Sequence, residues 1–413
     1  MICSTLGRMA LVGFGEFLPA LTLPGTSNPR YAVPSVAGRW TLLLFLPREG
    51  GADLAPLEAA IAPVRALLDD QRALLFLITP RAEALGTALR DHLPGIRILA
   101  DADGAALAAC GGAPAEGAAI LADPFQRVLA SGPLAVAPRL LAMLPELPPP
   151  ERHAGEEVPA PVLVLPRLLE PALCRRLIAL YEAGGATPSG FMREVDGRTV
   201  PVRDGSFKRR SDHTIADPEV LDALRQRLAR RLVPALRAAF QFEATRIERF
   251  IVACYDSSEG GFFRPHRDNT TRGTAHRRFA VTVNLNAEEF EGGELRFPEF
   301  GPRRYRAPTG GAVVFSCSLL HEAMPVTRGR RYAFLPFLYD EGGARIREAN
   351  LAYVGEAAAQ AGETSPDQTE PAPTAPERGA RAGGAPDGGD PGGRAPPGAP
   401  ARPGPGAAAA APA

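Results

Sequence analysis

Hydrophobic positions in the N-terminal third of the chain follow the patterns of buried strands and amphipathic helices. Continuous apolar runs at 40–46 and 74–78 are typical of strands buried on both faces, and the stretch 54–68 between them has apolar residues at helical spacing. Together these three segments predict a β-α-β unit. The same patterns predict further elements of a compact α/β domain: a helix at 82–93, strands at 96–99 and 118–121, and a helix at 136–144.

Shifts in composition divide the chain into four parts. We place the α/β domain at 12–146, a Pro-rich and extended linker at 147–160, a second domain at 161–356 and a Pro/Gly/Ala-rich tail at 357–413. The tail lacks periodic apolar residues and is therefore expected to be disordered. His153, within the linker, is expected to be a solvated side chain.

The second domain begins with two helical patterns. Apolar residues recur at helical spacing in 171–181 and again in 217–240, and both helices are expected to pack on the outside of a sheet. The stretch between them, 190–213, is polar, turn-rich and basic. It predicts either a solvated loop or a loop that closes over a substrate. His213, at its end, is expected at the surface or at the border of a substrate entrance.

Beyond residue 247 the pattern changes to short strands separated by glycine turns, which is typical of an antiparallel sandwich or barrel. The strand predicted at 278–286 places Thr282 and Asn284 on one face and Val281 and Val283 on the other. His321 is expected just past the end of a strand, with the last strand running beside it. The remaining predicted strands are 250–255, 262–268, 294–297, 312–317 and 331–339.

Candidate chemistry is concentrated in this strand-rich segment. His266 and Asp268 are two residues apart on a predicted strand, so their side chains can grip one ion from the same face. The chain contains 6 histidines, and a chance His-x-Asp is common, so this pair alone decides little. A third ligand from a distant strand, His321, would complete a two-histidine, one-carboxylate set that leaves positions open on a redox-active Fe(II).

Composition narrows the classes of function. Basic and acidic residues balance at 46 each, so nucleic-acid binding is not favoured, and no apolar run is long enough for a membrane span. The 5 cysteines are odd in number and scattered, which argues against a disulfide framework or a thiolate zinc site. Cys254 and Cys317 are expected to be buried small hydrophobes, and His276 has no evident role. We expect a soluble protein of a reducing cytoplasm.

The strand-rich segment resembles the prolyl 4-hydroxylase-like group of Fe(II)/2-oxoglutarate oxygenases. The resemblance spans roughly residues 160–355 and rests on five elements in the right order: Tyr255, Gly260-Gly261-Phe262-Phe263-Arg264-Pro265-His266-Arg267-Asp268-Asn269, Asn284-Leu285-Asn286 with Glu291-Gly292-Gly293-Glu294-Leu295, His321-Glu322 with Pro325-Val326-Thr327, and Gly329 with Arg331-Tyr332. It implies a double-stranded β-helix (jelly-roll) barrel with flanking helices.

The resemblance also implies a set of site residues and cofactors. His266, Asp268 and His321 would hold Fe(II), and Arg331 would bind the distal carboxylate of 2-oxoglutarate, because arginine offers a permanently charged bidentate partner. Arg330 is the competitor for that role. Tyr255 would bind the cosubstrate or pack in the core. Thr282 and Asn284 would line the same pocket or form a satisfied polar pair.

The implied reaction hydroxylates a C–H bond with O2 while 2-oxoglutarate is decarboxylated to succinate and CO2. Ascorbate is the usual auxiliary reductant in this family. The substrate is a protein or peptide, with peptidyl proline as one candidate, or a small molecule; fold alone does not choose between them.

The α/β domain resembles the peroxiredoxin branch of the thioredoxin-like fold. The resemblance rests on Gly15-Glu16-Phe17-Leu18-Pro19 and on Ala37-Gly38-Arg39-Trp40 before the first long strand. In that family the peroxidatic cysteine follows this strand, but residues 48–53 contain no cysteine. We therefore expect a degenerate, non-peroxidatic domain that serves for docking or spacing, with Cys110 as a structural thiol.

Two alternatives to the oxygenase remain at this point. The barrel could retain its metal without turnover and serve, with the α/β domain, as a binding scaffold. The chain could also be a thiol peroxidase, against which the missing cysteine counts heavily.

Overall fold

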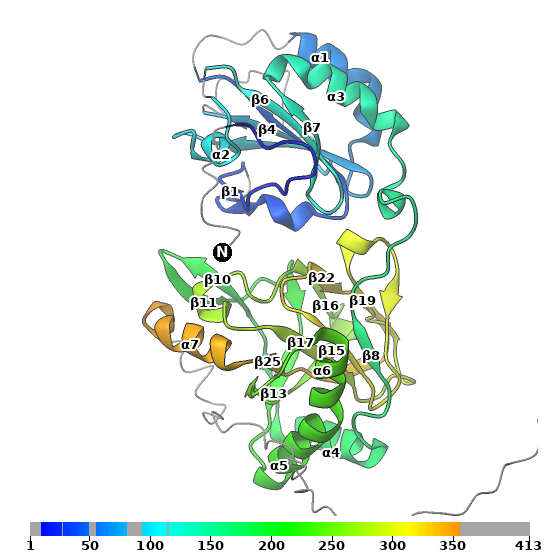
Figure 1. Cartoon of the computed structure of the whole chain (residues 1–413). Coiled ribbons are helices and arrows are strands. Elements are labelled where there is room, and N and C mark those ends of the chain that lie inside the picture. The colour runs from blue at the N-terminus through cyan, green and yellow to red at the C-terminus, as the bar shows by residue number, and fades with distance from the viewer. Residues whose placement is uncertain (1–9, 27, 49–54, 81–92, 114, 356–413) are drawn as a thin grey trace, which may run out of the picture. The chain divides into compact units, whose positions relative to one another are not determined.

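The computed structural model describes residues 10–26, 28–48, 55–80, 93–113 and 115–355 (Figure 1). The helix predicted at 82–93 and the tail predicted at 357–413 lie outside these ranges, apart from residue 93. Within the described ranges, no helix is both long and apolar enough to cross a membrane.

The N-terminal domain is built on a mixed sheet, coloured blue to cyan in Figure 1. Strand β3 (Trp40–Phe45) pairs in parallel with β4 (Ala73–Thr79), and α1 (Ala55–Ile61) connects them, so the predicted β-α-β unit is confirmed. The sheet continues to β5 on one side and to β6 and β7 on the other. The order is β5 (Ile96–Ala100), β4, β3, β6 (Ala118–Ala122), β7 (Val128–Gly132).

Both faces of this sheet are covered by apolar side chains, as the continuous apolar runs predict. Leu42 and Leu44 pack with α1 and with α3 (Ala137–Met143) on one face, while Leu43 and Phe45 join a second cluster on the other. Several short elements escaped the sequence patterns because they are too brief to show a period. They are β1 (Thr22–Leu23), β2 (Tyr31–Ala32), α2 (Ala105–Ala109) and β7.

The Pro-rich linker is not extended throughout, although its composition predicted an extended segment. Pro150–Arg152 forms a 3-10 turn, and the Nδ1 atom of His153 lies 2.8 Å from the carbonyl oxygen of Pro150. His153 is half-buried, so the expectation of a solvated histidine is wrong. The local turn brings the ring back against its own backbone.

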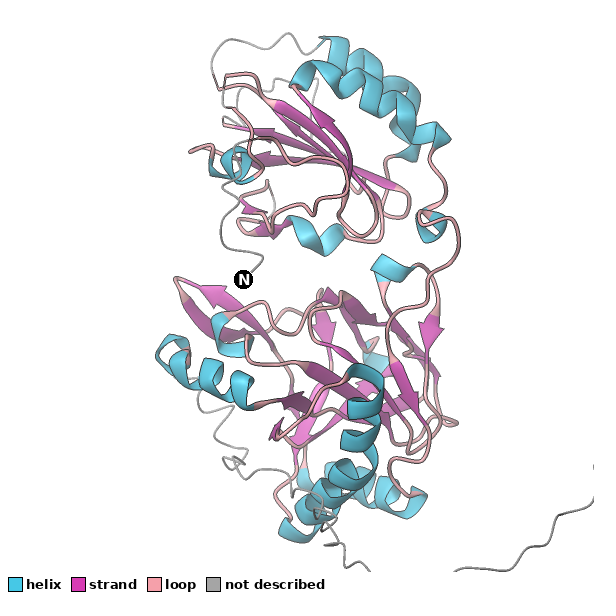
Figure 2. Ribbon diagram, viewed as in Figure 1, coloured by secondary structure: helices cyan, strands magenta, loops and turns pink. Residues whose placement is uncertain are grey.

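The helices of the second domain cover one face of its larger sheet, as predicted (Figure 2). They are α4 (Pro171–Gly184), α5 (Pro218–Arg227) and α6 (Val233–Phe240), and a π-helical turn (Leu228–Leu232) joins the last two into one run. The carboxylate of Asp217 caps α5 by accepting hydrogen bonds from the backbone N–H groups of Glu219 and Val220. The inner side of this run packs on Val281 and Val283.

The rest of the second domain is formed of antiparallel strands in two main sheets, which confirms the predicted antiparallel architecture. The larger sheet has the order β14 (Arg246–Glu248), β25 (Phe337–Tyr339), β17 (Phe279–Asn284), β24 (Arg330–Phe334), β15 (Ile251–Asp256), β13 (Ser211–Thr214), β9 (Thr187–Pro188), with β21 (Ala312–Ser316) on β17 and β8 (Leu163–Leu165) on β21. The smaller has the order β12 (Lys208–Arg209), β16 (Phe262–His266), β22 (His321–Ala323), β19 (Leu295–Arg296), β20 (Arg304–Tyr305).

Strands alternate between these sheets along the chain, as a jelly roll requires. Strands β15, β17, β21 and β24 belong to the larger sheet, and β16, β19 and β22 lie between them in sequence but belong to the smaller one. Three small pieces lie outside these two sheets: the pair β10 (Phe191–Val195) and β11 (Arg198–Val202), the pair β18 (Glu291–Gly292) and β23 (Val326–Arg328), and the helix α7 (Glu341–Ala349).

Three sequence-based expectations about this domain are wrong. The stretch 190–213 is not a loop: it contains a hairpin of β10 (Phe191–Val195) and β11 (Arg198–Val202), followed by β12 and β13. The predicted last strand is two strands, β24 and β25, separated at Pro336. Strand β24 pairs with β15 and β17, and therefore does not run beside His321, which itself begins β22.

Candidate functional site

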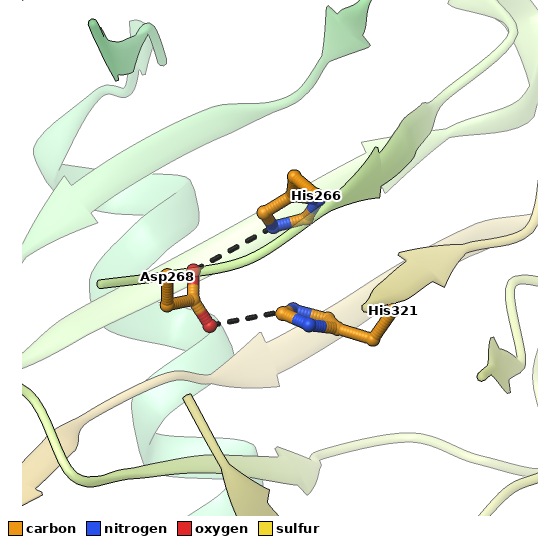
Figure 3. A group of neighbouring side chains, drawn as sticks. All are labelled: His266, Asp268 and His321. Atoms are coloured by element: carbon orange, nitrogen blue, oxygen red, sulfur yellow. Dashed lines mark ion pairs between the residues drawn. The ribbon is translucent and has the colours of Figure 1, made fainter. Parts of the chain in front are cut away.

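Two histidines and one aspartate converge at one end of the smaller sheet (Figure 3). His266, the last residue of β16, lies directly opposite His321 in the antiparallel register, and Asp268 follows two residues beyond the strand. One ligand atom from each side chain lies within 4.8 Å of the others. The Nε2 atoms of His266 and His321 are 3.6 Å and 3.3 Å from the two carboxylate oxygens of Asp268.

Backbone carbonyl groups orient both histidine rings for metal binding. The Nδ1 atom of His266 lies 2.7 Å from the carbonyl oxygen of Arg264, and that of His321 lies 3.0 Å from the carbonyl oxygen of Leu319. A carbonyl can only accept, so each Nδ1 carries the proton and donates it. Each Nε2 then keeps its lone pair toward Asp268, which is how metal-binding histidines are held.

Charge and burial favour, at Asp268 and His321, the protonation states that a divalent cation needs. Burial alone would raise the pKa of Asp268, but the His321 and His266 rings outweigh it and hold the pKa of this carboxyl below its usual range. Burial, together with the neighbouring His266, lowers the pKa of His321 to about 4. A carboxylate and a neutral imidazole are the forms that ligate Fe(II).

The loops that carry Asp268 and His321 are tied to each other. Asp268 donates its backbone N–H to the carbonyl of Cys317, at 2.9 Å. Arg267 forms an ion pair of 2.8 Å with Glu299, and Glu299 accepts the backbone N–H of Leu320 at 2.9 Å. Arg267, which lies between the candidate ligands His266 and Asp268 in the chain, therefore anchors the segment that leads to His321.

His276, expected to have no evident role, belongs to a buried ionic network behind Asp268. Its Nε2 atom lies 2.8 Å from the carboxylate of Glu248, and Arg277 donates to the same carboxylate through Nε, also at 2.8 Å. Arg277 further donates to the backbone carbonyl of Asp268, at 3.3 Å. The network therefore supports the turn that presents Asp268.

Arg331 points into the barrel, whereas its neighbour Arg330 points outward. Arg331 is 2% exposed, and its guanidinium carbon lies 5.1 Å from the ring centroid of Tyr255. Its Nε donates to the side-chain oxygen of Asn284 at 3.3 Å. Arg330 forms an ion pair of 2.7 Å with Asp256 on the exposed side of the sheet. Of these two neighbouring arginines, only Arg331 is placed to meet a ligand inside the barrel.

A cavity lies between the two sheets and contains the candidate site. Its lining includes Arg331, Tyr255 and Thr282 from the larger sheet, and His266 and His321 from the smaller one. Asn284 is buried but does not line the cavity, because its side chain is held between Arg331 and the carbonyl of Ala307, to which its Nδ2 donates at 2.7 Å. Asn284 is thus positioned to orient Arg331 rather than to contact a ligand.

Three basic residues of the cavity escaped the sequence analysis. Lys208 and Arg210, in the stretch predicted as a loop, are 6% and 7% exposed, and both line the cavity together with Arg249. One signal was available in the sequence: Lys208 is the sole lysine of the chain, while every other basic side chain apart from histidine is arginine. His213 does not line the cavity, and its Nδ1 lies 2.8 Å from the carbonyl of Gly185.

The cysteines near the site are buried thiols, as expected. Cys254 and Cys317 are 6% and 0% exposed, and neither forms a disulfide. Burial raises the pKa of Cys254 to about 11 and that of Cys317 well above its usual value. Neither thiol is therefore a ready nucleophile at neutral pH.

His266, Asp268 and His321 form a candidate metal site of the two-histidine, one-carboxylate type among the antiparallel strands. Comparison with known proteins identifies the relatives of this segment. Residues 250–339 match the 2OG-Fe(II) oxygenase superfamily. This stretch contains all three candidate metal ligands and Arg331.

Curated relatives match about a fifth of the chain. A PKHD-type hydroxylase of Pseudomonas fluorescens is 36% identical over 91 residues, which are 20% of this chain and 39% of that protein. One from a Synechococcus species is 32% identical over 93 residues, or 21% of this chain and 41% of that protein. The chain thus spans about two fifths of the length of these relatives.

Solved structures with similarity to this chain include two prolyl hydroxylases. A prolyl-4-hydroxylase of Pseudomonas putida aligns over 44% of this chain and 94% of its own, with 21% identity and a TM-score of 0.35. A Trichoplax adhaerens prolyl hydroxylase in complex with a hypoxia inducible factor peptide fragment aligns over 46% and 86%, with 19% identity and a TM-score of 0.34.

Proposed function

We propose that this protein is an Fe(II)- and 2-oxoglutarate-dependent dioxygenase that hydroxylates a C–H bond of its substrate. The main observation in support of this proposal is that His266, Asp268 and His321 converge in the same cavity that Arg331 lines. The oxygenase match of residues 250–339 supports the proposal. We assign the catalytic barrel to 161–356, with the jelly-roll arrangement in which strands alternate between two sheets.

The donor set fits Fe(II). Two imidazole nitrogens and a carboxylate on one side of an ion leave positions open for a chelating cosubstrate and O2. When bound there, Fe(II) supplies the oxidising chemistry, in which 2-oxoglutarate is decarboxylated to succinate and CO2. The protein supplies the three ligands, and Phe315 and Leu295 contribute apolar lining to the same cavity.

Arg331 is proposed to bind the distal carboxylate of 2-oxoglutarate. Arg331 is buried without an ion-pair partner among the described residues, and burial lowers the pKa of its guanidinium. A bound carboxylate would supply the missing countercharge in a bidentate geometry. Tyr255, beside the guanidinium, and Thr282, on the neighbouring strand, are proposed to contact the same cosubstrate.

We propose a peptide, with prolyl residues as one candidate, or a small molecule as the primary substrate, and ascorbate as the auxiliary reductant. The support for a peptide is that the relatives include proteins described as prolyl hydroxylases, one of them in complex with a peptide fragment. The N-terminal domain at 12–146 is proposed to be a thioredoxin-like module without peroxidatic chemistry that docks or spaces the catalytic domain, after a linker at 147–160.

Calorimetry under nitrogen tests whether the site is built for this pair of cofactors. The purified full chain should bind 2-oxoglutarate when Fe(II) is present and bind it much more weakly without Fe(II), because the cosubstrate chelates the metal. Asp268→Ala should remove the dependence on Fe(II). Binding of 2-oxoglutarate that is indifferent to both the metal and Asp268 would contradict the proposed site.

A further inference from the structure

Positive charge in the cavity exceeds the negative charge available to balance it. Arg210, Arg267 and Arg277 line the cavity but are paired: Arg210 at 2.6 Å with Asp212, Arg267 at 2.8 Å with Glu299, and Arg277 at hydrogen-bond distance with Glu248. Among the residues that the structure describes, the other lysine and arginine side chains buried or half-buried at the cavity form no ion pair with any carboxylate. These are Lys208, Arg249 and Arg331.

Arg249 presents a fixed guanidinium to this cavity. It precedes β15 with a left-handed backbone (φ 55°), a conformation that a non-glycine residue seldom adopts and that is common at functional sites. Its Nε donates to the carbonyl of Leu335 at 3.2 Å, and its guanidinium carbon lies 4.3 Å from the ring centroid of Phe337. The two terminal nitrogens make no hydrogen bond to any described residue, so they remain available to a ligand.

Lys208 lies on β12 of the smaller sheet, and the ring of Phe263 separates its amine from the candidate metal ligand His266. Its Nζ donates to Ser189 Oγ at 2.8 Å and to the carbonyl of Gly190, which leaves one donor over. The same Nζ lies 4.8 Å from the ring centroid of Phe263, and that ring stacks on His266 with centroids 3.5 Å apart. Burial, with Arg210 and Arg249 nearby, lowers the pKa of Lys208 well below its usual value.

Buried cations without a counterion are costly, and an anionic ligand would remove the cost. The proposed 2-oxoglutarate supplies one carboxylate for Arg331. A second anion would balance the guanidinium of Arg249 and would favour the protonated form of Lys208. The planar guanidinium of Arg249 has two parallel donors free, which is the arrangement that a carboxylate accepts in a bidentate manner.

We infer that the primary substrate carries a carboxylate, which binds to the guanidinium of Arg249 with the Lys208 amine beside it. This inference rests on the proposed oxygenase function, since it concerns the substrate of the same site. The carboxylate can belong to a free acid or to an acidic residue of a peptide, because the recognising groups are the same for both.

The test compares acids with their own amides, so that each pair differs only in the charge. The probes are N-acetyl-proline against N-acetylprolinamide for the free acid, and acetyl-Ala-Pro-Glu-amide against acetyl-Ala-Pro-Gln-amide for the peptide. Binding to the full chain loaded with Fe(II) and 2-oxoglutarate is measured by calorimetry under nitrogen. No turnover takes place without O2, so this result is independent of whether the protein hydroxylates anything.

In the wild type, the acid of at least one pair should bind about tenfold or more tightly than its amide, as loss of a charge-assisted hydrogen bond predicts. Arg249→Gln should remove this preference, and Arg249→Lys should keep part of it. Arg328→Gln is the matched control, because Arg328 is an exposed arginine of the same domain, 69% exposed and paired with Glu291. It should keep the full preference.

Three results would overturn the inference. The first is equal binding of acid and amide in both pairs, and the second is a preference that survives Arg249→Gln. The third is that Arg249→Gln weakens the binding of 2-oxoglutarate itself, which would mean that this arginine binds the cosubstrate. Whichever pair shows the preference in the wild type distinguishes the free acid from the peptide.

A second readout does not need the Arg249 variants to fold. Lys208 is the sole lysine, so biosynthetic labelling with ε-13C-lysine gives a single lysine signal from the whole chain. Binding of the preferred acid should shift this signal and its amide should not. An unmoved signal at saturating acid would contradict the place of Lys208 in the subsite.

Discussion

Arg330 and Arg331 are adjacent in the chain, yet their side chains lie on opposite faces of β24. Arg331 is 2% exposed beside Tyr255, and Arg330 forms an ion pair of 2.7 Å with Asp256. Alternation along a strand allows only one of two neighbours to enter the barrel. Substitution of Arg330 is therefore a matched control for substitution of Arg331 at the proposed cosubstrate site.

Arg331→Gln should raise the KM for 2-oxoglutarate by about 10- to 100-fold, because a neutral amide cannot replace a charge-assisted, bidentate pair. Arg330→Gln removes an exposed ion pair of the same strand and should change this KM by less than about threefold. Steady-state assays at varied 2-oxoglutarate measure both. Equal effects of the two substitutions would mean that Arg331 acts through folding rather than binding.

Glu248→Gln should destabilise the fold by about 3 kcal/mol, because it leaves Arg277 buried without its carboxylate. Urea unfolding measures the loss. The control is Glu291→Gln. Glu291 and Arg328 form an exposed ion pair, with side chains 60% and 69% exposed, so this substitution should lower the free energy of unfolding by less than about 1 kcal/mol. A loss for Glu248→Gln no larger than that of the control would show that the network does not support the site.

The effect of Glu248 should also depend on pH. Burial alone would raise the pKa of Glu248, but Arg277 and His276 outweigh it and hold the pKa well below its usual value. A carboxyl whose pKa is lower in the folded protein than in the unfolded chain stabilises the fold at pH values above its ordinary pKa of about 4.3. This stabilisation is lost as the pH falls through the pKa of the folded state. The difference between wild type and Glu248→Gln should be full at neutral pH and shrink in acid.

Lys208 should lose its proton at a lower pH than an ordinary lysine. Burial penalises its charged form, so the folded protein binds this proton less tightly than the unfolded chain, and the pKa lies well below about 10.4. Stability should therefore rise with pH between the lowered pKa and the ordinary one. The single ε-13C-lysine signal measures the titration, and a midpoint at or above the ordinary value would contradict it.

The N-terminal domain should not consume peroxide. Residues 48–53 contain no cysteine, and Cys110 is 0% exposed. Hydrogen peroxide loss in the presence of dithiothreitol should be the same for the wild type and Cys110→Ser, and no faster than without protein. Consumption that disappears in Cys110→Ser would make this domain a peroxidase with a displaced cysteine.

Periodicity predicted the strands with the clearest patterns. The continuous apolar runs of β3 and β4 follow from burial of both faces in an apolar core, and the alternation of β17 follows from an apolar face against the helices and a buried face that carries Thr282 and Asn284. The split between β24 and β25 was not apparent from apolar content, because residues 331–339 are almost continuously apolar and the break at Pro336 lies inside the run. Tertiary pairing also turned 190–213 into strands despite its polar sequence.

The candidate metal ligands could be proposed from spacing and family resemblance, because a metal site needs particular residue types in a particular order. The residues around them could not. Lys208 and Arg249 have no motif, and their burial depends on contacts with Phe263 and Phe337 from other strands. Likewise, the sequence left open whether Asn284 lines the cosubstrate pocket or forms a satisfied polar pair, because its hydrogen bonds to Arg331 and to the carbonyl of Ala307 depend on neighbouring segments of the fold.

Formation of succinate is the most direct test of the central claim that this site is an Fe(II)/2-oxoglutarate centre. The purified full chain is supplied with Fe(II), ascorbate, O2 and 2-oxoglutarate, and succinate is followed with and without peptide or acid probes. The wild type should produce succinate, and chelation of the metal or Asp268→Ala should abolish it. If the wild type produces no more succinate than Asp268→Ala with every probe, the protein holds its metal without turnover and the proposed activity is wrong.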